Sequence, residues 1–154
     1  MKRIFDFCFS LISIIVLSPL FLIIFFVIRL TSKGPAFFKQ ERIGLNGKPF
    51  IMLKFRTMRI HDDSKYVQTV ENDKRITSIG KYLRKSSIDE LPQLFNILIG
   101  EMSTVGPRPV AIPLNEKYTT VFRLFHLRHK VKPGLTGLAQ IKGFRGGDDL
   151  YHIE

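Results

Sequence analysis

The chain contains a single cysteine, Cys8, and it lies within a run of apolar residues. One cysteine excludes a disulfide framework and a thiolate-bound metal cluster, and it fits a reducing compartment. The Gly-rich phosphate loop, the dinucleotide fingerprint and the nucleophilic serine elbow are all missing. The pair His126 and His129, and the run 61–63, do not have the ligand spacing of zinc or calcium motifs.

Acidic residues are also scarce, with 13 Asp plus Glu against 24 Lys plus Arg and a net charge of +11 over 154 residues. A chain of this length forms one domain with a modest core. Its charge predicts anionic partners, which are nucleic acids, anionic lipids or phosphorylated substrates. Most phenylalanines lie in apolar stretches instead of alternating with basic residues, so nucleic acid is not expected as a partner.

Residues 7–28 carry no charged side chain. As a straight helix this segment would be about 33 Å long, enough to cross a bilayer. A secretory signal fits poorly because the apolar run is long and no small-residue cleavage site follows it. A buried core helix would leave little chain to cover it. The sequence therefore predicts insertion into a membrane.

The arrangement of this segment in the membrane depends on Ser18-Pro19, near its middle. Proline removes the hydrogen bond to the carbonyl of Ile15 and kinks a helix, and the Ser18 hydroxyl can satisfy part of the freed backbone. Basic residues flank both ends, which draws both ends to the cytoplasmic face: Lys2, Arg3, Arg29 and Lys33. A helix that bends and returns satisfies both facts, and a kinked helix that spans the bilayer remains the alternative.

The remaining sequence predicts an α+β fold that is mainly α. Residues 37–42 and 50–56 favour two short strands, and Asn46-Gly47 favours a hairpin turn between them. Residues 76–85 predict a basic amphipathic helix for a membrane surface or a core face. A further helix is expected from Ser87 to about residue 99 and another over 114–128. Residues 61–73 predict a loop or a weak helix, and 101–113 and 132–137 predict loops.

Two adjacent carboxylates, Asp89 and Glu90, stand at the expected start of the helix that Ser87 opens. Ser87 is predicted to cap this helix, and Glu90, three residues later, would complete a capping box. Pro92 fits in the first turn, where no N–H is needed. The carboxylates are therefore either capping residues or a reactive pair, and this motif alone leaves both interpretations open.

Several cationic residues, before and after the acid pair in the chain, could bind phosphate. Arg108 lies between two prolines, and a rigid backbone lowers the entropic cost of holding a guanidinium against phosphate. Lys54, Arg56 and Arg75 are further candidates for binding phosphate, although solvated surface positions are the alternative for each. An acid pair, many cations and a lipid anchor together suit phosphoryl transfer at a membrane, in which Mg²⁺ and cations neutralise the phosphate oxygens.

The ordered motifs of the chain resemble those of the bacterial sugar transferases, the monotopic polyprenyl-phosphate phosphoglycosyl transferases. The resemblance covers essentially the whole chain. It rests on these segments: Lys2-Arg3-x-x-Asp6, Ser18-Pro19, Gly34-Pro35, Gln40-x-Arg42-x-Gly44, Lys54-Phe55-Arg56-Thr57-Met58, Leu83-Arg84-x-x-Ser87-x-Asp89-Glu90-Leu91-Pro92-Gln93, Met102-Ser103-x-Val105-Gly106-Pro107-Arg108-Pro109 and Pro133-Gly134-x-Thr136-Gly137-x-Ala139-Gln140.

The resemblance implies a re-entrant membrane helix over residues 1–30 and a cytoplasmic catalytic domain over 31–154, at the bacterial inner membrane. It implies transfer of a sugar 1-phosphate from a UDP-sugar to undecaprenyl phosphate, with release of UMP, to initiate exopolysaccharide or other surface glycan synthesis. Asp89 is then the nucleophile that forms a phosphosugar-enzyme intermediate, and Glu90 helps to hold Mg²⁺. Arg84 and Arg108 match phosphate-binding positions, and a homodimer is a possible assembly.

Two positions depart from the family pattern. Leu138 stands where a tryptophan is common, so the local membrane or substrate contact is expected to differ. Residues 142–149 resemble the version found in exopolysaccharide-initiating members, with Lys142 in place of asparagine and with Arg145 as a further phosphate-binding candidate. This version favours a simple hexose donor such as glucose or galactose.

Relatives continue into a further helical segment beyond the position that matches Glu154, so the C-terminal part of the domain is expected to be truncated. The alternative function is therefore that of a catalytically impaired homologue that acts as a basic membrane-binding scaffold.

Overall fold

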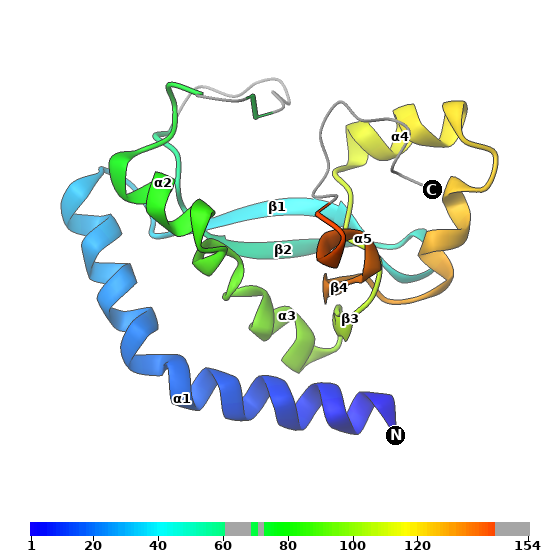
Figure 1. The fold of residues 1–154 in the computed structure, drawn as a ribbon, viewed down its shortest axis with the longest axis horizontal. Coiled ribbons are helices and arrows are strands. Elements are labelled where there is room, and N and C mark those ends of the chain that lie inside the picture. Colours follow the sequence, from blue (N-terminus) through cyan, green and yellow to red (C-terminus); the bar gives the residue numbers. More distant parts are fainter. Residues whose placement is uncertain (61–68, 71–72, 144–154) are drawn as a thin grey trace.

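The computed structural model describes residues 1–60, 69–70 and 73–143. As predicted, the fold is α+β and mainly helical, with one long apolar N-terminal helix and a short antiparallel hairpin (Figure 1). The elements in chain order are α1 Lys2–Thr31, β1 Phe37–Ile43, β2 Pro49–Phe55, α2 Ser78–Lys85, α3 Gln93–Ile99, β3 Ser103–Val105, α4 Ile112–Val121, β4 Gly134–Thr136 and α5 Leu138–Ile141, with 3₁₀ turns at Leu45–Gly47, Ile88–Glu90 and Phe125–Lys130.

Helix α1 is one continuous helix with a bend along its length (Figure 1). Pro19 lies inside it, and the Ser18 hydroxyl donates a hydrogen bond of 2.8 Å to the carbonyl of Ile15, the group that loses its N–H partner to the proline. The predicted local role of Ser18 at the break is therefore confirmed. Large apolar side chains remain exposed on the outer face of α1, including Ile12, Val16 and Phe26.

The hairpin forms as the sequence predicts. Strands β1 and β2 pair antiparallel from Phe37 opposite Phe55 to Ile43 opposite Pro49. The turn needs positive φ angles, and Asn46 and Gly47 adopt φ values of 55° and 76°. The hairpin gives the domain its rigid centre.

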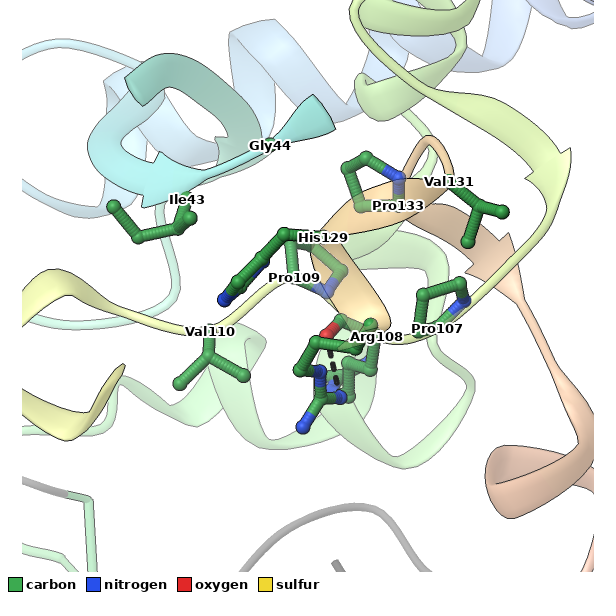
Figure 2. Close-up of a pocket in the computed structure, with 10 residues that line it drawn as sticks. Ile43, Gly44, Pro107, Arg108, Pro109, Val110, His129, Val131 and Pro133 are labelled. Carbon is green, nitrogen blue, oxygen red and sulfur yellow. Dashed lines mark hydrogen bonds between the residues drawn. The ribbon is translucent and has the colours of Figure 1, made fainter. Parts of the chain in front are cut away.

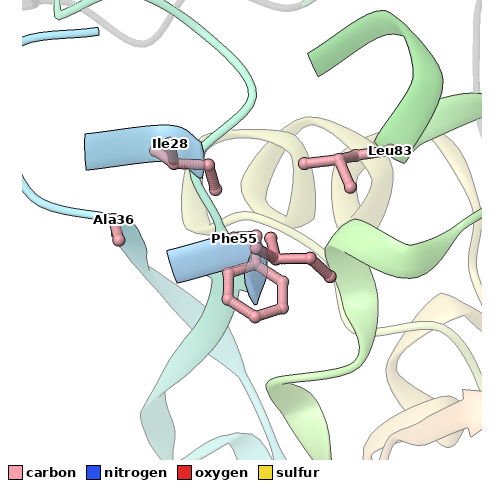
Figure 3. Close-up of a cluster of buried hydrophobic side chains, with 5 residues drawn as sticks. Ile28, Ala36, Phe55 and Leu83 are labelled. Carbon is pink, nitrogen blue, oxygen red and sulfur yellow. The ribbon is translucent and has the colours of Figure 1, made fainter. Parts of the chain in front are cut away.

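Two apolar clusters join α1 to the hairpin and to the following helices. In the first cluster, Ile28 of α1 packs with Ala36, with Phe55 of β2 and with Leu83 of α2 (Figure 3). In the second, Met52 of β2 packs against α3. Helix α1 contributes Phe21 to both clusters, so its inner face is part of the protein core.

Helix α2 agrees with the amphipathic helix predicted over 76–85, with the Thr77 hydroxyl accepting a hydrogen bond from Gly80 N–H at its start. Leu83 faces the core and Tyr82 is exposed.

The C-terminal predictions need correction. The helix expected over 114–128 ends at Val121, where α4 stops before the 3₁₀ turn. The loops expected over 101–113 and 132–137 contain β3 and β4, which pair in parallel.

Candidate active site

The acid pair lies in the 3₁₀ turn Ile88–Glu90, between α2 and α3. The predicted capping box is wrong. Ser87 adopts the left-handed conformation, with φ of 59°, its side chain does not cap the turn, and α3 begins only at Gln93. A non-glycine residue in this conformation is strained, and such strain is common where a chain must present functional groups. The sharp turn at Ser87 places Asp89 inside the domain, where it is only 7% exposed.

Glu90 binds two cationic side chains instead of capping a helix. The Lys54 ammonium of β2 donates to Glu90 Oε1 at 2.8 Å. The Arg108 guanidinium donates to Oε1 at 2.7 Å and to Oε2 at 3.2 Å. Three segments far apart in the sequence therefore meet at one carboxylate.

The environments of the two acids push their pKa values in opposite directions. Burial raises the pKa of Asp89 above its ordinary value, and the Glu90 charge adds to this, although Lys54 and Arg84 act against it. Burial also acts to raise the pKa of Glu90, but the hydrogen bonds and charges of Arg108 and Lys54 outweigh it and hold that pKa at about 2. Burial lowers the pKa of Lys54, while Glu90 opposes this.

The backbone that precedes Arg108 is held in place by the parallel pairing of β3 and β4. Gly106 N–H donates to Thr136 O at 2.9 Å, and Gly134 N–H donates to Pro107 O at 2.9 Å. The chains approach so closely that a Cβ on Gly106 would collide with the carbonyl of Lys132 and lie 2.9 Å from Gly134 N. The segment before Arg108 therefore has little freedom to move.

A small pocket lies beside the same loop (Figure 2). Pro107, Arg108 and Pro109 line it together with His129, whereas Asp89 and Glu90 do not. The dashed line in Figure 2 is the hydrogen bond of 3.1 Å from the Arg128 guanidinium to the carbonyl of Arg108. Arg128 thus holds the backbone of the residue that binds Glu90.

Arg84 approaches the acid pair from α2. Its Nε donates to the Thr57 hydroxyl at 2.8 Å, and its charge favours the ionised form of Asp89. Gly80 packs directly on the backbone of Thr57, so α2 lies against the chain that leaves β2. The structure thus brings together Asp89, Glu90, Arg84, Arg108 and Lys54, all of which were candidates from the sequence.

The other proposed phosphate-binding residues lie elsewhere or outside the described residues. Arg56 is buried, and its guanidinium donates to the carbonyls of Lys33 and Ser32 at 2.6 and 2.8 Å, so it holds the chain that follows α1. Arg75 forms an ion pair of 2.7 Å with Asp73. Arg145 lies outside the described residues.

Sequence reasoning from single residues did not find Thr57, Gly106 or Arg128 as supports of the site. The sequence does contain two Gly/Pro dipeptides, Gly106-Pro107 and Pro133-Gly134, and these are the segments that the structure pairs. Nothing in the local pattern of Arg128 distinguishes it from its basic neighbours.

Within residues 1–60, 69–70 and 73–143, no three Asp, Glu, His or Cys side chains form a group able to hold a metal ion alone. Mg²⁺ in proteins commonly takes one or two carboxylates and completes its shell with substrate phosphates and water. Asp89 and Glu90 are adjacent carboxylates of the kind such a site uses, but the Glu90 oxygens here accept from Lys54 and Arg108, so Mg²⁺ would have to replace those partners.

An acid pair thus lies among basic side chains, in a domain built against a long apolar helix. The chain belongs to the bacterial sugar transferase family, whose model matches residues 1–153.

The chain is 50% identical over 149 residues to the UDP-glucose:undecaprenyl-phosphate glucose-1-phosphate transferase of Klebsiella pneumoniae, covering 96% of this chain and 32% of that protein. It is 45% identical over 150 residues to the protein of the same name in Escherichia coli K12, covering 97% and 32%. It is 47% identical over 154 residues to the exopolysaccharide production protein PSS of Rhizobium leguminosarum, covering 97% and 77%. The chain thus spans about a third of the length of the first two relatives.

Proposed function

We propose that this chain is a phosphoglycosyl transferase that moves a sugar 1-phosphate from a UDP-sugar to undecaprenyl phosphate. The observation that carries this proposal is the placement of Asp89 and Glu90 among Lys54, Arg84 and Arg108. The names of the relatives support glucose as the sugar, and the exopolysaccharide protein supports a role in starting a surface polysaccharide.

In the proposed reaction, a carboxylate oxygen of Asp89 attacks the sugar-bearing β-phosphorus of the donor. The bond from that phosphorus to the bridging oxygen breaks, and UMP leaves with the bonding electrons. An oxygen of undecaprenyl phosphate then attacks the same phosphorus and releases Asp89. The raised pKa of Asp89 makes its ionised form a better nucleophile than an ordinary carboxylate, since nucleophilicity rises with basicity.

In the proposed reaction, the cationic side chains neutralise the negative charge on the phosphates. The Arg108 fork, which holds both Glu90 oxygens in the structure, is proposed to turn to phosphate oxygens when the donor binds, and Lys54 and Arg84 add positive charge nearby. Glu90 is the residue that would hold Mg²⁺, which supplies further neutralisation of phosphate charge when bound. Environments that separate the pKa values of two neighbouring acids are typical of sites where the acids have different tasks.

The membrane arrangement is proposed to be re-entrant, with both ends of α1 on the cytoplasmic face of the inner membrane. Both ends of α1 contact the same domain, through Arg3 bound to Ile97 O near one end and Ile28 packed on Phe55 near the other. A helix that crossed the bilayer straight would carry its ends to opposite faces. The exposed apolar face of α1 is the surface that would enter the lipid.

The test is release of UMP by the 154-residue chain in nanodiscs that contain undecaprenyl phosphate, with Mg²⁺ and a panel of UDP-sugars. UDP-glucose is expected to give the fastest release. Asp89→Asn is expected to abolish it, and radiolabelled sugar phosphate should remain on the wild-type protein when the acceptor is omitted. Glu116→Gln, an exposed carboxylate of α4, is the matched control and should keep wild-type turnover.

Wild-type turnover by Asp89→Asn would remove the assignment of the nucleophile. Absence of UMP release with every donor, together with salt-sensitive binding to anionic vesicles, would overturn the proposed activity in favour of a membrane-binding scaffold.

A further inference from the structure

The N-terminal end of α1, residues 2–6, carries polar side chains that the proposed reaction does not use. Asp6 is only 3% exposed, although it carries a carboxylate on an otherwise apolar helix. It accepts a hydrogen bond from the Ser103 hydroxyl at 2.8 Å and one from Thr104 N–H at 2.9 Å. A buried carboxylate is retained at a cost unless its partners compensate for the lost water. Asp6 therefore makes a specific connection to β3.

Arg3, at the same end of α1, makes a second connection. Its guanidinium donates to Ile97 O at 2.6 Å and to Leu98 O at 2.7 Å, which are carbonyls of the last turn of α3. Ile97 O also accepts from Gly100 N–H at 3.0 Å at the helix end, and a cation beside these last carbonyls complements the helix dipole. The N-terminal end of α1 thus holds both α3, which follows the acid pair, and β3, which precedes Arg108.

The route from Asp6 to the site is short and rigid. Ser103 and Thr104 open β3, Val105 pairs with Thr136, and Gly106 is hydrogen-bonded to that same residue two positions before Arg108. Arg108 then binds Glu90. Displacement of β3 therefore moves the guanidinium relative to the carboxylate.

We propose that Asp6 is a positioning residue: it couples the membrane helix to the loop of Arg108 and so sets the distance between Arg108 and the acid pair. The proposal rests on the proposed function for its kinetic consequence, whereas its structural part is independent of that function. Asp6 does not contact the site itself, and its proposed effect on phosphate binding is exerted through Arg108.

The structural part is tested by hydrogen–deuterium exchange on the full chain in nanodiscs. Asp6→Ala removes the acceptor of Thr104 N–H, so the amides of residues 103–106 and 108 should exchange several-fold faster, while those of α2 keep their rates. Asp6→Asn should change exchange less, because its amide oxygen still accepts from Thr104. Ser10→Ala is the matched control, since Ser10 is buried on the same helix and its hydroxyl bonds within it, to Phe7 O. Unchanged exchange over 103–106 and 108 in Asp6→Ala would overturn the proposal.

The kinetic part is tested by a double-mutant cycle on UMP release. Asp6→Ala is expected to lower kcat/KM for the UDP-sugar about tenfold in the wild-type background, but much less in Arg108→Lys, because the contact it supports is already altered. Equal losses in both backgrounds would show that Asp6 does not act through Arg108. If Asp6→Ala does not fold, Ser103→Ala removes one of the two bonds and is measured in the same cycle.

These outcomes separate the two proposals. A wild-type chain without UMP release would contradict the proposed function and leave the exchange result to decide the role of Asp6. An active wild-type chain with an additive cycle would contradict the positioning role alone.

Discussion

Replacement of Glu90 by glutamine tests the electrostatics of the site through stability instead of activity. The carboxyl of Glu90 has a pKa of about 2 in the folded chain against an ordinary value of 4.5, because Arg108 and Lys54 outweigh the effect of burial. This difference corresponds to about 3 kcal/mol of stability, at 1.36 kcal/mol for each factor of ten. The side chain is 16% exposed, so solvent screens the contribution only slightly.

The sign of the pH dependence follows from the direction of that change. A carboxyl whose pKa is lowered on folding stabilises the folded state fully above its unfolded pKa and loses that contribution as the pH falls through its folded pKa. For Glu90 the window runs from about 4.5 down to about 2. Wild type should therefore exceed Glu90→Gln in stability at pH 7, and the difference should shrink below pH 4.5.

Thermal unfolding in detergent micelles, followed by far-UV circular dichroism between pH 7 and pH 3, measures this difference. A loss of about 3 kcal/mol corresponds to a decrease in Tm of about 6–12 °C for a chain of this size. Glu116→Gln should change Tm by less than about 2 °C because its side chain is exposed. A Tm difference between wild type and Glu90→Gln that stays constant from pH 7 to pH 3 would refute the ion-pair reasoning.

Two further predictions concern the nucleophile and the loop behind Arg108. The rate of UMP release should fall with decreasing pH through a pKa above 3.8, because burial raises the pKa of Asp89 and only the ionised form attacks; a rate limited by an acid at or below 3.8 would contradict this. Gly106→Ala should lower both Tm and UMP release, because its Cβ would collide with the carbonyl of Lys132; unchanged values of both would show that the β3–β4 contact can relax.

Local chemistry predicted the features whose cause lies within a few neighbouring residues. Asn46-Gly47 specified its turn because only a few residue types tolerate positive φ, and Pro19 specified the freed carbonyl that Ser18 binds. The capping box failed for a different reason. Glu90 had the spacing of a capping residue, but Lys54 and Arg108 are distant in sequence and compete for the same carboxylate more strongly than a backbone N–H.

The pairing of β3 and β4 escaped prediction because each strand is only three residues long and contains turn-forming neighbours. Its stability comes from close contact between glycine backbones, which carries no hydrophobic period. Arg56 is a case in which the sequence motif predicted a site residue that the structure places elsewhere. It shares a motif with Lys54, but β2 ends at Phe55, so Arg56 lies beyond the strand and instead holds the chain that follows α1.

The two sides of helix α1 show why the sequence alone could not decide how this helix lies in a membrane. One side of it packs on Phe55 and Met52 within the domain, and the other exposes apolar side chains such as Ile12 and Phe26. Lipid and protein core both accept apolar side chains, so the sequence shows a continuous apolar run without the polar stripe of a surface helix. The information that distinguishes the two sides lies in Arg3 and Asp6, because their partners are on the domain. Charged side chains that bind the domain from the end of an apolar helix are therefore evidence of where that helix contacts protein.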